Sequence, residues 1–158
     1  MHNKKVMFIS SNGGHLSELM QLKSLFKKFD YHIVTEKAKS NHYLQEEYRD
    51  KITFLVYGTK KNPFTYFFVC LFNFIKSLII FFKQKPDVIV TTGTHTAVPM
   101  CYIAKFFRKK VIYIETFANR NTKTVAGNLV YPIADVFVVQ WEEMLEKYPK
   151  AEYWGWIF

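Results

Sequence analysis

Residues 5–29 are KVMFISSNGGHLSELMQLKSLFKKF, and this stretch decides the fold of the chain. An apolar strand at 6–9 is followed by a turn at 10–14 and then by a helix with leucines at helical spacing. Gly13 and Gly14 allow backbone angles that a Cβ would forbid, so the amide groups of the turn can approach a ligand closely. A strand, a glycine-rich turn and a helix typically open an α/β domain that recognises nucleotides or phosphate. A plain tight turn without a ligand remains the alternative, because the spacing matches neither the dinucleotide-binding nor the Walker pattern.

The composition indicates a single domain that binds a phosphate-bearing partner and exposes apolar surface. The 158 residues carry a net charge of +9, which attracts nucleic acid, an anionic membrane or a phosphorylated small molecule. Phe occurs 16 times, which predicts apolar surface beyond the needs of a core. The two cysteines lie in apolar segments and suggest reduced thiols, and no secretory signal precedes the first strand. No metal or other cofactor is expected.

Strand and helix patterns alternate along the rest of the chain. Apolar, β-branched runs predict further strands at 31–35, 52–57, 87–92, 111–115 and 135–140. Helices are expected at 63–84, 97–107, 124–134 and 142–147, and residues 38–50 are expected to form a polar helix or loop. This alternation predicts a parallel sheet of about six strands with helices on both faces, a single Rossmann-like domain over residues 1–158.

Three loops of this predicted fold follow the carboxyl ends of strands and therefore share one crevice. They carry glycines, hydroxyls, a histidine and an arginine, which suit an oxygen-rich anion such as a diphosphate bearing a sugar. The predicted ligand residues are Asn12, Gly13, Gly14, Thr92, Gly93, Thr94, His95, Thr96, Asn119 and Arg120. Structural alternatives stay open, because a glycine can merely start a helix and a threonine can merely cap one.

His15 and Glu115 are the candidate catalytic residues of this crevice. His15 stands at a helix N-terminus, where the helix dipole disfavours a charged imidazolium and leaves a neutral ring able to accept a proton. That suits a general base for a sugar hydroxyl. The alternatives are that His15 packs locally and that Glu115 is a surface carboxylate at a strand end.

The predicted helix at 63–84 is almost entirely apolar outside one polar arc of roughly 120°. It is long enough to span a bilayer, but spanning would separate the strands that flank it in the chain. Burial among other helices is a second possibility. The favoured interpretation is a helix that packs one side on the sheet and lays the other in the membrane interface, with Lys60, Lys61, Lys83 and Lys85 near the headgroups. The predicted membrane residues are Phe64, Phe67, Phe68, Phe72, Ile75, Ile79 and Phe82.

Three motifs, SNGGHL at 11–16, PDVIVTTG at 86–93 and IETFA at 114–118, resemble those of a known family. These are bacterial capsule and exopolysaccharide biosynthesis proteins that act as accessory subunits of split glycosyltransferases. They are similar to the membrane-anchored subunit of the eukaryotic enzyme that adds the second N-acetylglucosamine to dolichol diphosphate. Both are similar to the N-terminal half of the peptidoglycan lipid-intermediate N-acetylglucosaminyltransferase, a GT-B enzyme.

The resemblance implies a role for each motif. Residues 13–15 match the loop that faces the diphosphate and sugar of the acceptor, and residues 92–94 match the second loop, with fewer glycines than in the peptidoglycan enzyme. Glu115 and Asn119 fall where that enzyme has an acidic residue and an asparagine. Without the N-terminal anchor of the eukaryotic subunit, the aromatic helix is expected to supply any membrane attachment.

The resemblance also implies a function that depends on a partner. We expect an acceptor-binding subunit, at the cytoplasmic face of the cell membrane, of an inverting glycosyltransferase whose catalytic subunit carries the UDP-sugar. The acceptor is expected to be a polyprenyl-diphosphate-linked saccharide. The tail at 150–158 is expected to dock the partner through Tyr153, Trp154, Trp156, Ile157 and Phe158. The alternatives are a self-sufficient small glycosyltransferase and, less favoured by the scattered basic residues, a nucleic-acid-binding module.

Overall fold

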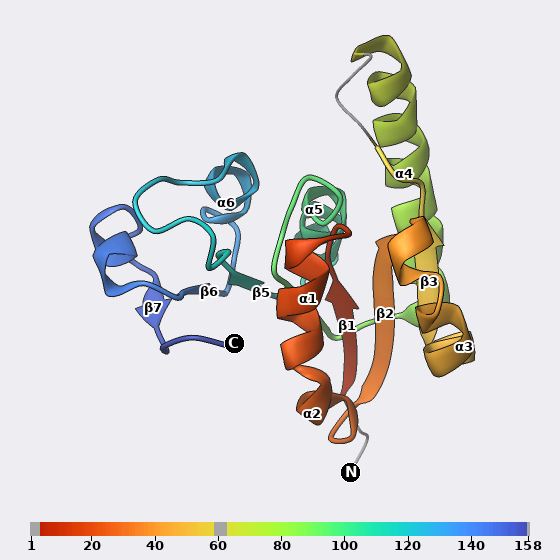
Figure 1. Ribbon diagram of the computed structural model, residues 1–158, viewed down its shortest axis with the longest axis horizontal. Coiled ribbons are helices and arrows are strands. Elements are labelled where there is room, and N and C mark those ends of the chain that lie inside the picture. Colours follow the sequence, from red (N-terminus) through yellow and green to blue (C-terminus); the bar gives the residue numbers. More distant parts are fainter. Residues whose placement is uncertain (1–3, 59–62, 158) are drawn as a thin grey trace.

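A computed structural model describes residues 4–58 and 63–157 (Figure 1). Seven parallel strands form one sheet in the order β3-β2-β1-β4-β5-β6-β7. The strands are β1 (Lys5–Ile9), β2 (Asp30–Glu36), β3 (Ile52–Leu55), β4 (Val88–Thr91), β5 (Lys110–Ile114), β6 (Val136–Val139) and β7 (Glu152–Tyr153). The predicted Rossmann-like parallel sheet is confirmed. The short edge strand β7 was not predicted, since a two-residue strand leaves no periodic pattern.

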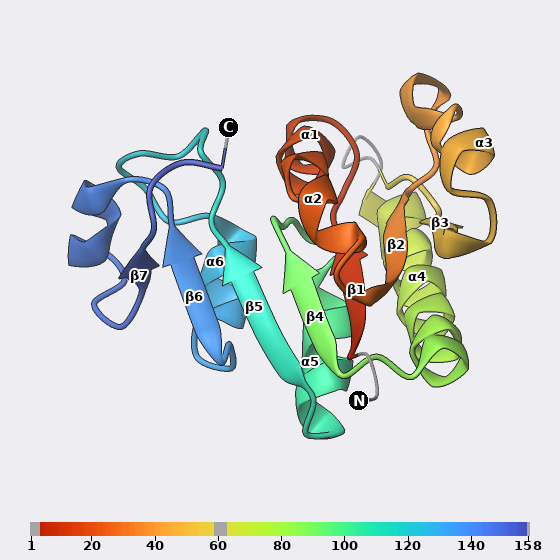
Figure 2. The same ribbon diagram turned by 90° about the horizontal axis from the view of Figure 1, so that it is seen from below.

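Helices cover both faces of the sheet (Figure 2). They are α1 (Gly14–Gln21), α2 (Lys23–Phe26), α3 (Leu44–Tyr48), α4 (Pro63–Gln84), α5 (Val98–Phe106) and α6 (Val125–Val130). Single helical turns are η1 (Lys39–Asn41), η2 (Arg49–Lys51) and η3 (Glu142–Glu146). Strand β1 shows the alternation: Val6 and Phe8 belong to the core under α1 and α2, whereas Met7 and Ile9 belong to the core under α4 and α5.

The strand order places the candidate site. The chain runs from β1 outward to β3, and α4 then returns it to β4 on the other side of β1. The order therefore reverses between β1 and β4, and ligands of open α/β sheets bind outside the carboxyl ends of strands at such a point. The motif at 11–16 begins in the loop after β1, and the motif at 86–93 ends in the loop after β4.

Several element boundaries differ from the predicted ones for local reasons. The single helix predicted after the glycine turn, carrying residues from His15 to Phe26, is two helices, which meet at Leu22. Strand β3 ends at Leu55 rather than Tyr57, because the Asn73 side chain bonds both the N–H (2.9 Å) and the C=O (2.8 Å) of Val56. A side chain on α4 thus takes the place of a neighbouring strand.

Helix α4 buries two polar side chains together with Ile80 and Phe81, and its exposed face is largely apolar. Asn73 and Ser77 are 7% and 0% exposed, so this part of the polar arc faces the protein. The exposed apolar side chains of α4 are Phe64, Phe67, Phe68, Leu71, Phe72, Phe74, Ile75, Ile79 and Phe82. The segment Tyr66–Gln84 has the length and hydropathy of a membrane span, yet only 22% of that window is buried inside the protein. Burial of α4 among other helices is therefore wrong, and the position of β3 and β4 in one sheet argues against a helix that crosses a bilayer.

Candidate functional site

The first two loops are joined directly at the carboxyl edge of the sheet. The Ser11 N–H donates to the Gly93 carbonyl at 3.1 Å, and the Thr94 hydroxyl donates to the Ser11 hydroxyl at 3.2 Å. The Thr92 hydroxyl in turn donates to the His15 carbonyl at 2.6 Å. The two glycine-containing segments, far apart in the sequence, therefore form one surface, as the sequence predicts.

His15 is held at the start of α1 in a defined tautomer. Its Nδ1 lies 2.7 Å from the Thr92 carbonyl, and a carbonyl only accepts, so Nδ1 carries the hydrogen. In the neutral ring Nε2 is then the free acceptor. Gly93 makes room for this ring: its φ is +94°, and a Cβ there would lie 3.1 Å from the Tyr113 hydroxyl and 3.5 Å from His15 Nδ1. The arrangement suits proton acceptance at Nε2.

The glycine turn itself is open. Gly13 has a φ of +83°, which favours glycine, and a Cβ at Gly13 or Gly14 would meet nothing within 4 Å. Gly13 is the N-cap of α1 and no side chain caps this helix end. The turn therefore offers backbone amides and the positive end of an eight-residue helix to open space, which suits an anion.

A buried glutamate that sequence reasoning missed ties these loops to β2. Glu36, 2% exposed, accepts from the Asn12 N–H at 3.3 Å and from the Thr96 hydroxyl, and His95 Nε2 lies 3.4 Å away. Burial raises the pKa of Glu36, but these hydrogen bonds outweigh it and hold the pKa below its usual value. Asn12 and Thr96 therefore shape the loops through Glu36, and their contact with a ligand stays a prediction.

Glu115 at the end of β5 is enclosed by donors from its own chain. Its carboxylate accepts from the Thr116 N–H (3.0 Å), the Thr124 hydroxyl (2.9 Å) and the Tyr148 hydroxyl (2.8 Å), and the residue is 1% exposed. Gly127 packs so closely that a Cβ would lie 2.2 Å from Glu115 Oε2. This geometry favours a structural role, in which Glu115 fixes the third loop to α6. Its catalytic role stays a prediction.

Glu18 connects α1 to the third loop and was also missed. It lies one turn after His15, is 3% exposed, and accepts from the Thr116 hydroxyl at 2.7 Å and the Phe117 N–H at 3.0 Å. Its Oε2 is buried and has no partner among the described residues. Burial raises the pKa of Glu18 in spite of these bonds. An isolated Glu in a helix carries no sequence signal of such a contact, which depends on the third loop.

The remaining predicted residues of the third loop lie further toward β6. The Arg120 guanidinium pairs with Glu143 of η3 and lies 5.0 Å from the centre of the Trp141 ring. Asn119 is half-buried, and its N–H donates to the Thr116 carbonyl at 3.3 Å. The structure thus joins the first two loops closely but turns Arg120 away, toward the C-terminal segment.

The predicted docking tail packs partly on its own domain. Trp156 lies 5.2 Å from the Phe117 ring and 5.0 Å from the Trp141 ring, and the Ile157 N–H donates to the Gln140 side chain. Tyr153, Trp154 and Trp156 are nevertheless 43%, 63% and 57% exposed. Phe158 lies outside the described residues, as do Lys60 and Lys61. A role for the tail in binding a partner stays a prediction.

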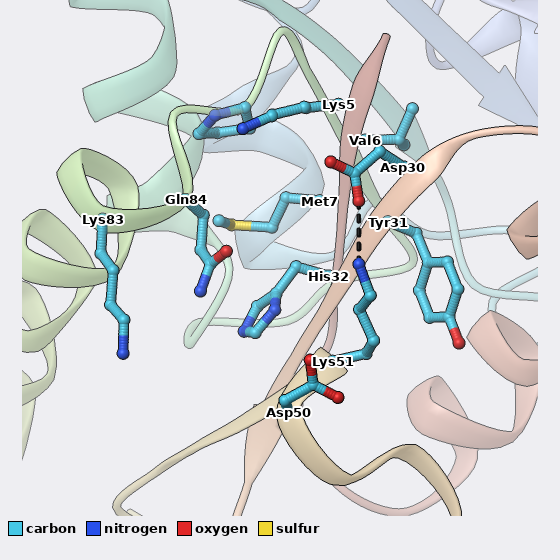
Figure 3. A pocket seen from close by; sticks show the side chains of 11 residues that line it. Lys5, Val6, Met7, Asp30, Tyr31, His32, Asp50, Lys51, Lys83 and Gln84 are labelled. Carbon is cyan, nitrogen blue, oxygen red and sulfur yellow. Dashed lines mark hydrogen bonds and ion pairs between the residues drawn. The ribbon is translucent and has the colours of Figure 1, made fainter. Parts of the chain in front are cut away.

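A separate pocket of about 320 Å³ lies at the opposite, amino edge of the sheet (Figure 3). The Lys51 ammonium there pairs with Asp30 at 2.9 Å, and His32 Nε2 lies 2.8 Å from the Thr53 hydroxyl. Burial first, and then Lys51 and Lys83, lower the pKa of His32 to about 4, so its ring is neutral near pH 7. This pocket has no connection with the glycine turn.

The fold is shared with proteins of known structure. MurG from Acinetobacter baumannii has a TM-score of 0.69 at 15% identity over 89% of this chain. A UDP-N-acetylglucosamine 2-epimerase from Rickettsia bellii has a TM-score of 0.72 at 16% identity over 99% of this chain. The chain spans 42% and 46% of those two chains. Fold and site together define a Rossmann-like domain of the kind that forms one half of a GT-B protein.

The sequence comparisons identify the family within this class. The profile of oligosaccharide biosynthesis proteins described as Alg14-like matches residues 6–157, and the chain belongs to this family. The mouse UDP-N-acetylglucosamine transferase subunit ALG14 is 30% identical over 96% of this chain and 82% of its own length. The Debaryomyces hansenii subunit is 29% identical over 98% and 77%. The matched part of the Candida albicans subunit, at 37% identity, is only 42% of that protein. The predicted resemblance to the eukaryotic subunit is confirmed, whereas the bacterial capsule and exopolysaccharide context stays a prediction.

Proposed function

We propose that this chain is the acceptor-binding, membrane-recruiting subunit of a heteromeric glycosyltransferase. The named relatives are subunits of a UDP-N-acetylglucosamine transferase, which supports a protein that works with a partner. The observation that carries the proposal is the open glycine turn beside His15, a site for an anion next to a proton acceptor. The partner contributes the UDP-sugar, and the acceptor is a polyprenyl-diphosphate-linked saccharide in surface polysaccharide biosynthesis.

The chemistry assigned to the site is deprotonation of the acceptor. The diphosphate binds at the amides of the Gly13–Gly14 turn, and Nε2 of His15 takes the proton of the acceptor hydroxyl. The hydroxyl oxygen forms its bond to C1 of the donor sugar as the bond from C1 to UDP breaks, with inversion. The Nδ1–H bond to the Thr92 carbonyl keeps the lone pair on Nε2 until Nε2 takes the proton, and it then holds the imidazolium in place.

The exposed face of α4 supports attachment to the cytoplasmic membrane surface. Helix α4 exposes nine large apolar side chains, whereas a helix that faces water exposes a polar side. The lysines Lys83 and Lys85 at its end are exposed and suit anionic headgroups. We infer that α4 lies in the interface, on the side where the lipid-linked acceptor is found.

The test is transfer from UDP-N-acetylglucosamine to a polyprenyl-diphosphate-linked monosaccharide in membranes. Transfer is measured with this chain alone, with a candidate catalytic subunit alone, and with both together. Strong transfer with both only is expected, and transfer by this chain alone would establish a self-sufficient enzyme instead. Transfer that is the same with and without this chain would refute the proposal.

His15→Ala tests the base within that assay. We expect a loss of roughly 10²- to 10⁴-fold in turnover of the assembled complex, the usual contribution of a general base, with the two chains still co-purifying. His42→Ala, at an exposed histidine that is not among the predicted site residues, is the matched control and should leave turnover unchanged. Unchanged turnover in His15→Ala would remove this residue from the mechanism.

A further inference from the structure

A groove of about 580 Å³ leads away from the candidate site between α4 and α6. Its walls come from the start of α4, the loop after β4, and the first turns of α5 and α6. The side chains that matter here are Tyr66, Thr94, His95, Pro99, Val125 and Leu129. A volume of this size lies within the usual range of roughly 300–1,000 Å³ for small-molecule sites.

One end of the groove belongs to the candidate site. The Thr94 hydroxyl in the groove wall donates to the Ser11 hydroxyl at 3.2 Å, and Ser11 is two residues before the glycine turn. His95, beside it, contacts the Tyr66 ring with 5.7 Å between ring centres. This contact joins α4 to the loop after β4. A molecule with its charged group at the glycine turn therefore has this groove as a direct continuation.

The rest of the groove is apolar and open. Val125 and Leu129 on the α6 side are 74% and 46% exposed, and Phe67, next to Tyr66 on α4, is 63% exposed. The Thr124 hydroxyl is committed to Glu115 and to the Gly127 N–H, so it offers little to a polar occupant. The walls therefore suit hydrocarbon, and the rim joins the apolar surface of α4.

The direction of α4 brings this rim to the carboxyl edge of the sheet, where the glycine turn lies. Helix α4 follows β3, so it starts at the carboxyl edge, and Figure 1 shows its first half extending beyond the ends of β1 and β2. The glycine turn, the groove and the protruding part of α4 thus lie at one edge. A lipid that leaves the membrane beside α4 would meet the groove before it meets the turn.

We propose that this groove binds the first isoprene units of the acceptor's polyprenyl chain, next to the diphosphate at the glycine turn. The inference rests on the proposed function for the identity of the lipid. It adds a lipid subsite, and with it selection for acceptors whose chain is long enough to fill the groove.

Val125→Asp tests the subsite, with Phe106→Asp as its matched control. Both residues are exposed apolar side chains, at 74% and 81%, but Phe106 lies at the end of α5 outside the groove. In detergent micelles with the partner present, Val125→Asp should raise the KM for a polyprenyl acceptor about tenfold, equal to about 1.4 kcal/mol of lost binding. It should leave the KM within twofold for an acceptor whose diphosphate carries a methyl group in place of the prenyl chain. Phe106→Asp should change neither value.

Equal effects of Val125→Asp on both acceptors, or equal effects of the two variants, would overturn the proposal. A second measurement does not depend on transfer: a polyprenyl diphosphate without sugar, carrying a photoreactive group in its first isoprene unit, is cross-linked to the chain. We expect labelling at residues 94–99 or 125–129, and labelling confined elsewhere would refute the groove. Failure of wild-type transfer to either acceptor, with groove labelling retained, would refute the proposed function and leave the subsite standing.

Discussion

Gly127→Ala should destabilise the protein although alanine is the better helix former. Gly127 lies inside α6, and its φ is not in the left-handed region, so the backbone accepts alanine. Helix propensity alone would then stabilise the variant by about 1 kcal/mol. The new methyl group, however, would lie 2.2 Å from Glu115 Oε2 and 2.6 Å from the Tyr148 hydroxyl, against an ordinary contact of 3.4 Å or more.

The cost follows from what holds Glu115 in place. Its Oε2 would have to recede by about 1.2 Å to reach an ordinary contact. That movement disrupts the bonds from the Tyr148 hydroxyl at 2.8 Å and the Thr124 hydroxyl at 3.0 Å, each worth about 1.5–3 kcal/mol to a charged acceptor. Glu115 and Tyr148 are 1% and 0% exposed, so neither can swing into solvent. With both bonds lost and the gain in propensity subtracted, about 2–5 kcal/mol of stability should be lost.

Urea unfolding followed by circular dichroism measures this loss as a lower midpoint at unchanged slope. Gly14→Ala is the control, since a Cβ there meets nothing within 4 Å; its stability should match or slightly exceed that of the wild type. A Gly127→Ala variant as stable as the wild type would show that Glu115 is free to move. The structural role assigned to that carboxylate would then be wrong.

Two further predictions concern the membrane face and the amino-edge pocket. The double variant Phe72→Glu and Ile79→Glu should lose the flotation with anionic liposomes that the wild type shows. The control Phe29→Glu, on the opposite side of the sheet, should retain it. Equal flotation of the wild type and both variants would refute membrane contact by α4. The pKa of His32 is lowered to about 4 in the folded protein, so the unfolded chain binds more protons below pH 6.5 and stability should fall as the pH drops from 6.5 toward 4. In His32→Gln, the loss of unfolding free energy should be smaller by up to about 1.4 kcal/mol per pH unit. Urea unfolding of both proteins at pH 7 and pH 5 measures this difference. Identical pH profiles of the two proteins would contradict the lowered pKa.

Much of the fold could be predicted because its strands are local patterns. Residues 6–9, 31–35 and 88–91 are apolar, β-branched runs of strand length, and the glycine turn at 13–14 marks the start of a helix. Their parallel order follows from the helices between them. The two-residue strand β7 and the break at Leu22 could not be predicted, because they depend on contacts with η3 and on the local dihedral angles.

The candidate site could be predicted only in part. The glycine turn, His15 and the loop after β4 meet because parallel strands end at one edge, a rule that needs no side-chain detail. The contacts of Glu18 and Glu36 join residues that are 24 to 99 positions apart in the sequence, and no periodic pattern predicts such contacts. Helical spacing likewise separated the polar arc of α4 from its apolar arc without indicating which arc faces the sheet.

The burial of Asn73 and Ser77 and the exposure of apolar side chains on α4 also change how variants of this chain should be chosen. In an ordinary domain, a designer seeking solubility leaves the apolar side of a helix alone and adds charge to its polar side. Here the polar side carries Asn73, whose amide substitutes for a neighbouring strand at Val56, and replacing it by leucine would orphan two backbone groups. The exposed phenylalanines of α4, unlike the buried Phe81, are the positions open to redesign, and a soluble version of the chain for crystallisation would begin there.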